Sequence, residues 1–178
     1  MNYNTAINYG SKVLKKNLVK TANIDSEIIL SKTVNLSREK ILLNLDNILS
    51  SKQLKYFKKL INRRKKKEPI SLIIKKKYFW KYEFVVNKNV LIPRPETEFL
   101  VEEILKTYKE KNNLNILDVG VGSGCILISL LKEKNKWKGD GIDISSLAIK
   151  TAKTNAKIQQ VENRIRFKNS NIDNFSIK

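Results

Sequence analysis

Apolar residues follow a helical period through the first part of the chain. Ile7, Leu14 and Leu18 recur near the spacing of helix turns, with polar residues between them. The same pattern of apolar and polar positions continues to about Glu68. We therefore expect residues 1–68 to form a small helical bundle.

Residues that commonly begin and end helices divide this segment. Asp25 is placed to cap one short helix, and Ser37 is placed to cap the next. Ser50 followed by Gln53 fits a capping box at the start of a further helix. Because proline lacks an N–H group and its ring clashes with the preceding turn, Pro69 should stop that helix.

The pattern changes after Pro69. We expect a strand over residues 70–74, followed by two short strands over 78–80 and 84–86 that form a hairpin. Pro93 and Pro95 make a stiff, extended loop that leads into a helix. The residues expected on the buried side of this helix are Leu100, Val101, Ile104 and Leu105.

From residue 115 onward, strands and helices are predicted to alternate. The expected strands are 116–119, 139–143 and 165–168, and the expected helices are 125–131 and 147–156. Alternation of this kind predicts parallel strands joined by right-handed crossovers. The fold class is therefore α/β, with a small N-terminal helical bundle, a β-hairpin linker and the first half of a Rossmann-like domain.

The chain is strongly basic. It has 36 Lys and Arg against 17 Asp and Glu, a formal net charge of +19 in 178 residues. Such a charge favours a polyanionic partner. Lys, Asn and Ile are all abundant, however, which favours a compositional bias as the source of the charge. The basic run 63–67 is interpreted as a solvated helix end, where cations suit the helix dipole.

Several kinds of chemistry are excluded by composition. Cys125 is the one cysteine and histidine is absent, which rules out internal disulfides and Ser-His or Cys-His catalysis and makes a zinc site unexpected. We expect no metal site. The first ten residues lack a signal-peptide pattern, and no apolar run approaches the ~20 residues of a membrane span. We expect a cytoplasmic protein without a membrane anchor.

The segment from Asp118 to Gly124 carries the candidate site. Here the predicted strand turns into a helix through three glycines. Glycine is needed where φ is positive, and where a ligand lies against bare backbone. The strand end and the positive helix N-terminus together predict a pocket beside the sheet.

Two features narrow the choice of ligand for this turn. A dinucleotide fingerprint requires its third glycine where Cys125 stands, so the Gly-x-Gly-x-Gly spacing favours S-adenosylmethionine over a pyrophosphate. Asp143 follows at the end of the next strand, where an acid accepts hydrogen bonds from ribose hydroxyls. Its alternative role is to cap the following helix, but Ser145 and Ser146 lie nearer to the helix start.

These motifs resemble those of a known family. The stretch Leu-Ile-Pro-Arg-Pro-Glu-Thr-Glu at 91–98 is similar to the signature of the release factor glutamine methyltransferases, called PrmC or HemK. The same family is matched by three dipeptides, at 63–64, 79–80 and 155–156, and by the sequence Glu-Pro-Ile at 68–70. Phe79 and Trp80 themselves are interpreted as packing residues.

The resemblance implies three domains. Residues 1–68 would dock a release factor, residues 69–92 would form a β-hairpin linker, and residues 93–178 would be part of a class I methyltransferase domain. The implied activity is transfer of a methyl group from S-adenosylmethionine to the side-chain amide of a glutamine in class I peptide chain release factors. We expect the protein to be a monomer.

The resemblance also assigns binding roles to residues. The ones implied to hold the cofactor are Gly120, Val121, Gly122, Ser123, Gly124, Asp143, Asn171 and Ile172. Asn171 replaces the family's aspartate beside the adenine but keeps the ability to form hydrogen bonds, and Ile172 is expected to pack against the ring. Arg94 is expected either to reach the pocket or to pair with Glu96 or Glu98.

The family's catalytic motif, Asn-Pro-Pro-Tyr, does not occur among these residues. By family spacing it would follow Lys178, so no catalytic residue is assigned here. We expect strand 116–119 to lie at the edge of an incomplete sheet, and the 178-residue chain alone to be poorly stable and inactive.

Three other functions stay open. The net charge favours an amino-methyltransferase acting on RNA or DNA, although the proline-arginine-proline signature disfavours a nucleic-acid partner. A non-enzymatic protein would keep the helical domain as a release-factor-binding module. An NAD-dependent dehydrogenase is the weakest alternative, because Cys125 replaces the required glycine.

Overall fold

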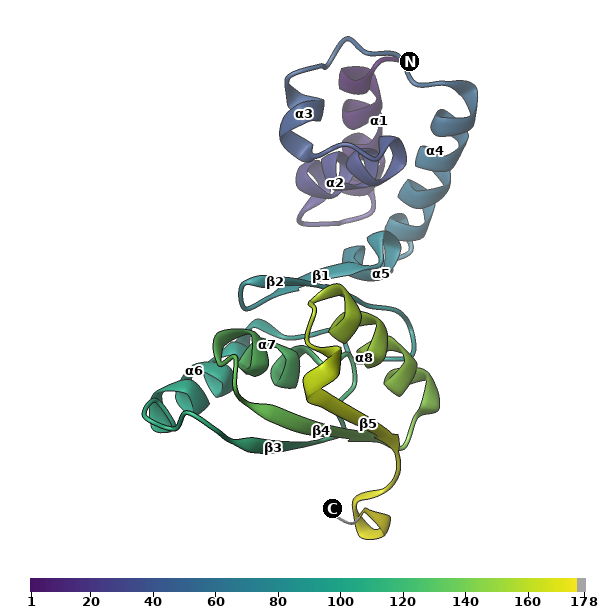
Figure 1. Cartoon of the computed structure of the whole chain (residues 1–178). Coiled ribbons are helices and arrows are strands. Elements are labelled where there is room, and N and C mark those ends of the chain that lie inside the picture. The colour runs from purple at the N-terminus through teal and green to yellow at the C-terminus, as the bar shows by residue number, and fades with distance from the viewer. Residues whose placement is uncertain (176–178) are drawn as a thin grey trace. The chain divides into compact units, whose positions relative to one another are not determined.

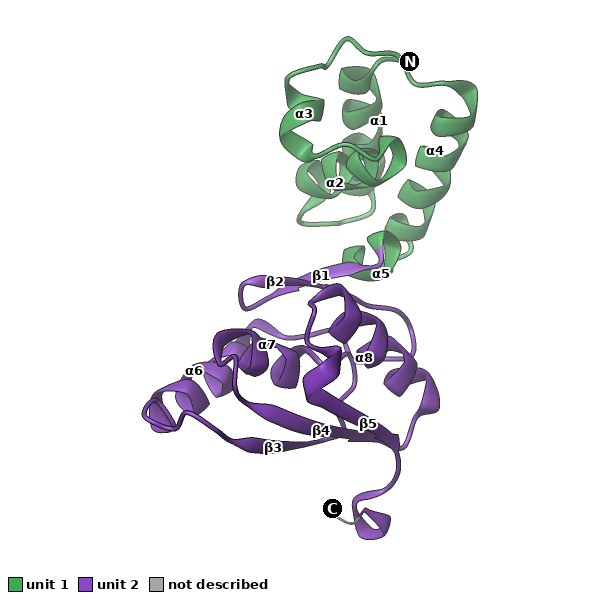
Figure 2. Cartoon of the chain, in the orientation of Figure 1, with its two compact units in different colours: residues 1–74 green, residues 75–178 purple. Residues whose placement is uncertain are grey.

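The computed structural model describes residues 1–175 of the chain. It divides the chain into two compact units, of which the first spans residues 1–74 and the second begins at Lys75 (Figure 2). The structural boundary therefore lies after Ile74, whereas the sequence placed it after Glu68 and set the hairpin apart as a linker. Each unit is described by itself.

The first unit is a bundle of helices around one apolar core, as the sequence predicted. Its elements are α1 (Tyr3–Lys16), α2 (Ala22–Val34), α3 (Arg38–Leu42), α4 (Ser51–Lys65) and α5 (Ile70–Ile74). Leu14 of α1, Ile29 of α2 and Phe57 of α4 are completely buried and pack in this core. Leu18, which fits the same helical spacing, lies beyond the end of α1 with a φ of 56° and is exposed.

The predicted helix caps are confirmed at α3 and α4. The side chain of Ser37 accepts a hydrogen bond from the Lys40 amide. At α4, the Gln53 amide donates to the Ser50 hydroxyl at 3.2 Å and the Ser50 amide donates to the Gln53 side chain at 2.9 Å, which completes the capping box.

The prediction that Asp25 caps a helix is wrong. Asp25 lies inside α2, and Thr21 occupies the N-cap position. The carboxylate of Asp25 is buried and accepts hydrogen bonds from Arg64 Nε at 2.7 Å and from the Thr21 hydroxyl at 2.8 Å. The basic run is therefore only partly solvated, because Arg64 folds back into the bundle and Arg63 pairs with Glu68.

The predicted strand at residues 70–74 is also wrong, because this segment is helix α5. The amides of Leu72 and Ile73 donate to the Pro69 carbonyl at 3.0 and 3.2 Å. Helix α4 ends at Lys65, so Pro69 lies beyond its C-cap and accepts the first hydrogen bonds of α5 through its carbonyl. The prediction that Pro69 stops α4 is therefore wrong. An apolar run of this length does not distinguish a buried strand from a buried helix by periodicity.

The second unit begins with the predicted hairpin. Strand β1 (Lys76–Phe79) pairs antiparallel with β2 (Tyr82–Val85). A short 3₁₀ turn, η1 (Pro95–Thr97), then leads into α6 (Glu98–Thr107). Val101 of α6 is fully buried, but Leu100 is 48% exposed and does not share the buried face that the sequence assigned to it.

The alternating elements that follow form a parallel sheet, as predicted. They are β3 (Asn115–Val119), α7 (Cys125–Glu133), β4 (Lys138–Asp143), α8 (Ser146–Ile158), η2 (Glu162–Arg164), β5 (Ile165–Asn169) and η3 (Ile172–Asn174). The strand order is β3-β4-β5, so β3 lies at an edge of this sheet in the described part of the chain. Helices α7 and α8 cover the same face of the sheet (Figure 1).

Glu133, at the end of α7, ties the hairpin to the rest of the second unit. Its carboxylate accepts hydrogen bonds from the Trp80 indole, the Lys81 ammonium and the Tyr82 hydroxyl, each at 2.9 Å. Burial and the hydrogen bond to Glu133 raise the pKa of Tyr82 to about 12. Within the described residues, no helix is long and apolar enough to cross a membrane.

The pair between Asp25 and Arg64 should contribute more to stability than the neighbouring pair between Arg63 and Glu68. Arg64→Ala leaves a buried carboxylate with one neutral partner, and should lower the free energy of unfolding by about 3 kcal/mol. Arg63→Ala opens a more exposed pair and should cost less than about 1 kcal/mol. Urea denaturation of the two variants measures this difference, and equal costs would contradict the assignment.

Candidate functional site

The predicted binding turn joins the end of β3 to the start of α7. The amides of Gly120 and Val121 both donate to the Ile142 carbonyl, at 2.8 and 2.9 Å, and the Gly124 amide donates to the Val121 carbonyl at 2.7 Å. The turn is thus held against the end of β4. It lies at the carboxyl edge of the parallel strands, where ligands bind in open α/β sheets.

The three glycines of this turn are required for different reasons. All have positive φ, at 76° for Gly120, 54° for Gly122 and 80° for Gly124. A Cβ added at Gly120 would meet no atom within 4 Å, and one at Gly122 would meet only a backbone oxygen at 3.7 Å. At Gly124 it would lie 2.8 Å from the Ile128 side chain. Gly124 therefore serves helix packing, and the other two border open space.

Asp143 lies at the end of β4, directly beside the turn. Its Oδ2 accepts a hydrogen bond from the Gly122 amide at 3.0 Å, and its Oδ1 accepts one from the Ser145 amide at 2.8 Å. Ser145, through its hydroxyl, caps α8. Asp143 is therefore not the N-cap of α8. A carboxylate oxygen accepts more than one hydrogen bond, so both oxygens keep capacity for a ligand.

Asn155 of α8 is part of this site, although the sequence suggested no role for it beyond the family spacing. Its side chain is completely buried. The amide donates to the Ser123 carbonyl at 2.8 Å and to the Val85 carbonyl at 3.0 Å, and its oxygen accepts from the Val85 amide at 2.7 Å. A polar residue on the apolar face of a predicted helix is the signal that points to such a role.

Asp118, in β3, and Cys125, at the start of α7, flank the turn and have raised pKa values. Burial raises the pKa of Asp118 to about 6, and the charge of Asp143 adds to this rise while a backbone hydrogen bond opposes it. Burial likewise raises the pKa of the Cys125 thiol to about 11. Cys125 is therefore protonated at neutral pH and unsuited to act as a nucleophile.

The two residues implied to contact adenine follow β5 at the same edge of the sheet. The Ser170 amide donates to the Asp143 carbonyl at 3.1 Å, which brings this segment next to the turn. Asn171 and Ile172 are exposed, and the Asn171 amide donates to Asp173 at 3.0 Å. In the part of the chain that the structure describes, no hydrogen bond joins either residue to the glycine turn.

The proline-rich signature lies outside this cluster of interactions. Arg94 is exposed and forms no salt bridge among residues 1–175, so it does not pair with Glu96 or Glu98. Phe79 is buried edge-to-face against Phe84, with ring centroids 6.2 Å apart. This confirms Phe79 as a packing residue.

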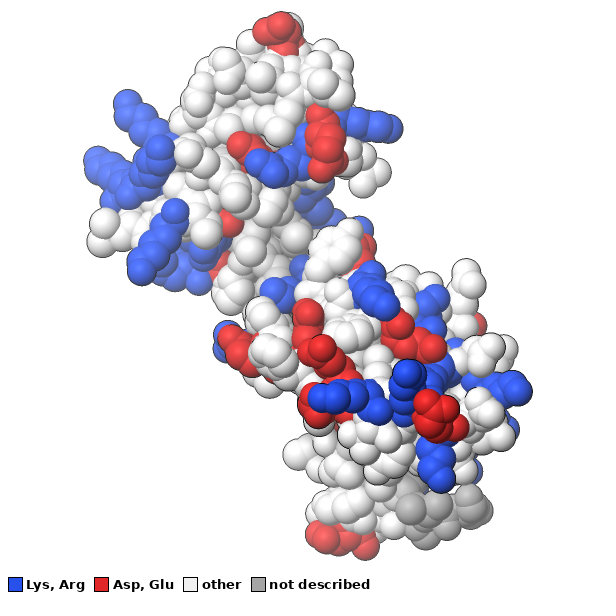
Figure 3. Space-filling view, turned by 90° about the vertical axis from the view of Figure 1, so that its left-hand side faces the viewer, with Lys and Arg blue, Asp and Glu red and all other residues white. Residues whose placement is uncertain are grey.

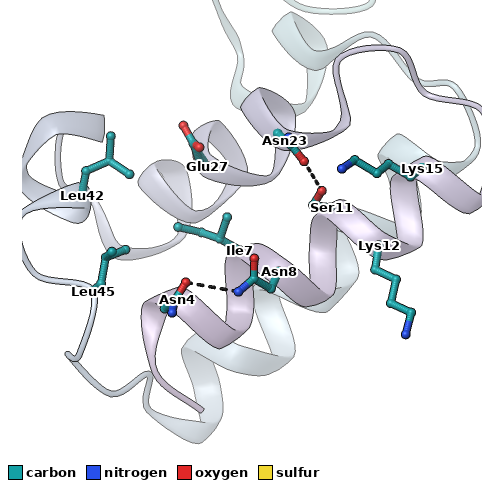
Figure 4. A pocket seen from close by; sticks show the side chains of 10 residues that line it. All are labelled: Asn4, Ile7, Asn8, Ser11, Lys12, Lys15, Asn23, Glu27, Leu42 and Leu45. Carbon is teal, nitrogen blue, oxygen red and sulfur yellow. Dashed lines mark hydrogen bonds between the residues drawn. The ribbon is translucent and has the colours of Figure 1, made fainter.

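A separate cavity of about 580 Å³ lies in the first unit (Figure 4). It lies between α1, α2 and the segment after α3, and its lining is rich in amides and lysines. Its one carboxylate, that of Glu27, already pairs with Arg38. The described residues hold no group of His, Cys, Asp and Glu able to ligate a metal. This cavity therefore suits binding and not acid–base chemistry.

Two family profiles match the chain, one in each unit. The profile described as "PrmC N-terminal domain" matches residues 5–74, and the profile described as "Methyltransferase domain" matches residues 110–178. The chain belongs to the release factor glutamine methyltransferase family. The resemblance inferred from the motifs and the predicted fold class are thereby confirmed.

Relatives in this family are longer than the chain. The release factor glutamine methyltransferase of Leptospira interrogans is 38% identical over 94% of this chain and 59% of its own length. The one of Caulobacter vibrioides is 49% identical over 61% of this chain and 37% of its own length. A solved methyltransferase from Geobacter sulfurreducens, in complex with S-adenosyl-L-homocysteine, is 27% identical over 43% of this chain and 29% of its own, with a TM-score of 0.37.

The raised pKa of Asp118 should make this family member less stable as the pH rises. The folded-state value of about 6 exceeds the unfolded value of 3.8, so the folded protein holds a proton that the unfolded chain has lost. The contribution of protonated Asp118 to the free energy of unfolding is therefore fully present below the unfolded pKa. It is lost as the pH rises through the folded pKa.

Asp118→Asn should remove this dependence and raise the free energy of unfolding at neutral pH by about 2 kcal/mol. Denaturation at about pH 4.5 and about pH 7.5 tests the expectation, with Asp140→Asn as the control on the neighbouring strand. The expectation fails if Asp118→Asn and the unsubstituted chain lose the same free energy of unfolding between the lower and the higher pH. Burial of the ionised Asp118 would then not be the cause of the pH dependence.

Proposed function

We propose that this chain is the cofactor-binding and partner-docking part of an enzyme that methylates a glutamine side chain in class I peptide chain release factors. S-adenosylmethionine would be the methyl donor. The observation that carries the proposal is the glycine turn, which borders open space at Gly120 and Gly122 and has the Asp143 carboxylate beside it.

The hydrogen bonding of the turn favours a cationic ligand over a phosphate. Phosphate sites use free backbone N–H groups at a helix N-terminus. Here the amides of Gly120, Val121, Gly122 and Gly124 all donate to acceptors within the protein. Asp118, at the end of β3, and Asp143, which bonds to the Gly122 amide, place negative charge next to the turn. This arrangement suits the sulfonium and ammonium groups of S-adenosylmethionine and disfavours the pyrophosphate of NAD.

The residues of this chain would bind and orient the cofactor. Gly120 to Gly124 would lie along its methionine part, and Asp143 would accept hydrogen bonds from the ribose hydroxyls. Asn171 and Ile172 would border the adenine. The cofactor supplies an electrophilic methyl group, but a glutamine amide nitrogen is a poor nucleophile because its lone pair is delocalised. Its positioning at the methyl group therefore decides the rate.

Methyl transfer also requires groups that hold and orient the glutamine amide, and these 178 residues do not contain them. The family's Asn-Pro-Pro-Tyr motif grips the glutamine NH₂, and the three prolines here, at 69, 93 and 95, are not part of such a motif. We infer that the 178-residue chain binds the cofactor without transferring its methyl group.

Cofactor binding should depend on Asp143. Asp143→Ala removes two charge-assisted hydrogen bonds to the ribose and should weaken binding of S-adenosyl-L-homocysteine by a factor of about 10 or more. Asp140→Ala, on the same strand, breaks an ion pair with Arg166 instead and should leave binding unchanged. Isothermal titration calorimetry measures both. Equal affinities for the two variants would refute the ribose role of Asp143.

Gly120 provides a second, independent variant of the same site. In Gly120→Ala the new methyl group projects into the open space, so binding should be lost while the positive φ costs about 1 kcal/mol of stability. Gly124→Ala should be more destabilising because its methyl group overlaps Ile128. If Gly120→Ala binds the cofactor normally, the turn does not hold it.

The 178-residue chain should show no turnover on a class I release factor in a tritiated methyl-transfer assay. A chain extended to include the Asn-Pro-Pro-Tyr motif should be active, since positioning of the amide is restored. Turnover by the short chain would contradict the role of that motif. Preference of the extended chain for bulk RNA would instead favour the amino-methyltransferase alternative, which the charge of +19 supports.

A further inference from the structure

We propose that the exposed face of α4 binds single-stranded RNA, with its lysines along the phosphate backbone and Tyr56 stacked on a base. This role goes beyond the proposed methyl transfer, and it uses α4 of the first unit and not the glycine turn of the second. The proposal is carried by how charge is distributed in the first unit, by the spacing of residues on α4 and by the aromatic side chains among them.

In the first unit, every ion pair is formed by an arginine and none by a lysine. Residues 1–74 contain 13 lysines and 3 arginines against 5 acidic residues. The arginines pair with acids in three bridges, Arg38–Glu27, Arg63–Glu68 and Arg64–Asp25. In this fully described unit none of the lysines forms a salt bridge, and all are exposed. Their charge is therefore available to a polyanion.

The lysines of α4 form a stripe along one face of the helix. Ser51–Lys65 contains no Asp or Glu. Lys52, Lys55 and Lys59 follow at spacings of three and four residues, which places them on one side of the helix. At a rise of about 1.5 Å per residue, the stripe from Lys52 to Lys66 is about 20 Å long. It can therefore follow several successive phosphates.

A shallow groove runs along the same face. Its volume is about 430 Å³. Its lining residues are Lys55, Lys58, Lys59, Asn62, Arg63 and Lys66. Every one carries a donor group, and the cations far outnumber any other kind of side chain. Such a lining suits phosphate oxygens, and the Asn62 amide both donates and accepts, as recognition of a ribose 2′-hydroxyl requires.

Aromatic rings lie among these lysines. Tyr56 is 40% exposed and shares the face of Lys52 and Lys59 by its spacing. Tyr9 of α1 is 38% exposed, and the Lys58 ammonium lies 5.5 Å from its ring centroid. Proteins that bind single strands combine a basic groove with aromatic rings on which bases stack. This combination distinguishes an RNA strand from an acidic protein as the partner.

Compositional bias alone would scatter lysines among acids, as happens in the second unit. There, Lys76 pairs with Glu83, Lys81 with Glu133 and Arg166 with Asp140. In Figure 3, most of the Lys and Arg seen on the first unit, in the upper part of the view, lie along its left side, and others lie beside Asp and Glu on its right. Within α4 itself, no acidic residue offsets the basic charge.

Helix α8 supplies a matched control. Lys150, Lys153 and Lys157 repeat the spacing of Lys52, Lys55 and Lys59, and they line a groove of about 410 Å³. Helix α8 contains no aromatic residue, whereas α4 carries Tyr56. Substituting each set by glutamine removes the same charge from the full 178-residue chain. Fluorescence anisotropy with labelled oligouridylate of about 20 nucleotides measures binding over a range of salt concentrations.

The α4 triple variant should bind at least about tenfold more weakly, with the salt slope lowered by about 2, since each phosphate contact contributes about 0.7. The α8 triple variant should change affinity less than about threefold. Tyr56→Ala should weaken binding about tenfold and Tyr56→Phe should restore it, because stacking needs the ring and not the hydroxyl. Circular dichroism checks that all variants fold.

Three results would overturn the proposal. The first is an equal loss of affinity in the α4 and α8 variants, which would indicate non-specific attraction. The second is unchanged binding in Tyr56→Ala. The third is displacement of the RNA by poly-glutamate or oligothymidylate of equal charge at equal concentration, which would identify an acidic protein or a DNA strand as the occupant. None of these outcomes depends on methyl transfer.

Discussion

The end of β4 determines the geometry of the turn that follows β3. The Ile142 carbonyl accepts two amides of the turn and the Asp143 carboxylate accepts a third, so the backbone from Gly120 to Gly122 is fixed by one neighbouring strand. Because these bonds satisfy the amides, the turn presents bare backbone and nearby negative charge instead of donors. Parallel pairing of β3 with β4 is what brings the two segments together.

The position of the glycine turn, and of Asp143 beside it, was predictable from sequence because both follow from local features. Glycine adopts positive φ most readily, and the alternation of strands and helices fixes which strand end lies beside the turn. Asp143 follows directly from that topology. The capping box at Ser50 and Gln53 was predictable for the same reason, since its partners are three residues apart.

Features that depend on distant partners were not predictable. Asp25 and Arg64 are separated by 39 residues, and no local pattern shows that the two side chains meet inside the bundle. An acid near a helix start is ordinarily a cap, and only burial by α4 changes its role. The strand predicted at residues 70–74 was wrong for a related reason. The apolar run fits a strand or a helix equally well, and packing against α2 and α4 decides between them.

Asn155 has a further consequence for the hairpin. It bonds only to main-chain atoms of Val85 and Ser123, so the identity of either side chain is immaterial to the link. This link therefore depends on the side chain of Asn155 and not on the side-chain chemistry of its two partners. The hairpin lies 70 residues from Asn155 in the chain, yet Asn155 connects it to the glycine turn. A shortened hairpin would therefore remove a support of that turn.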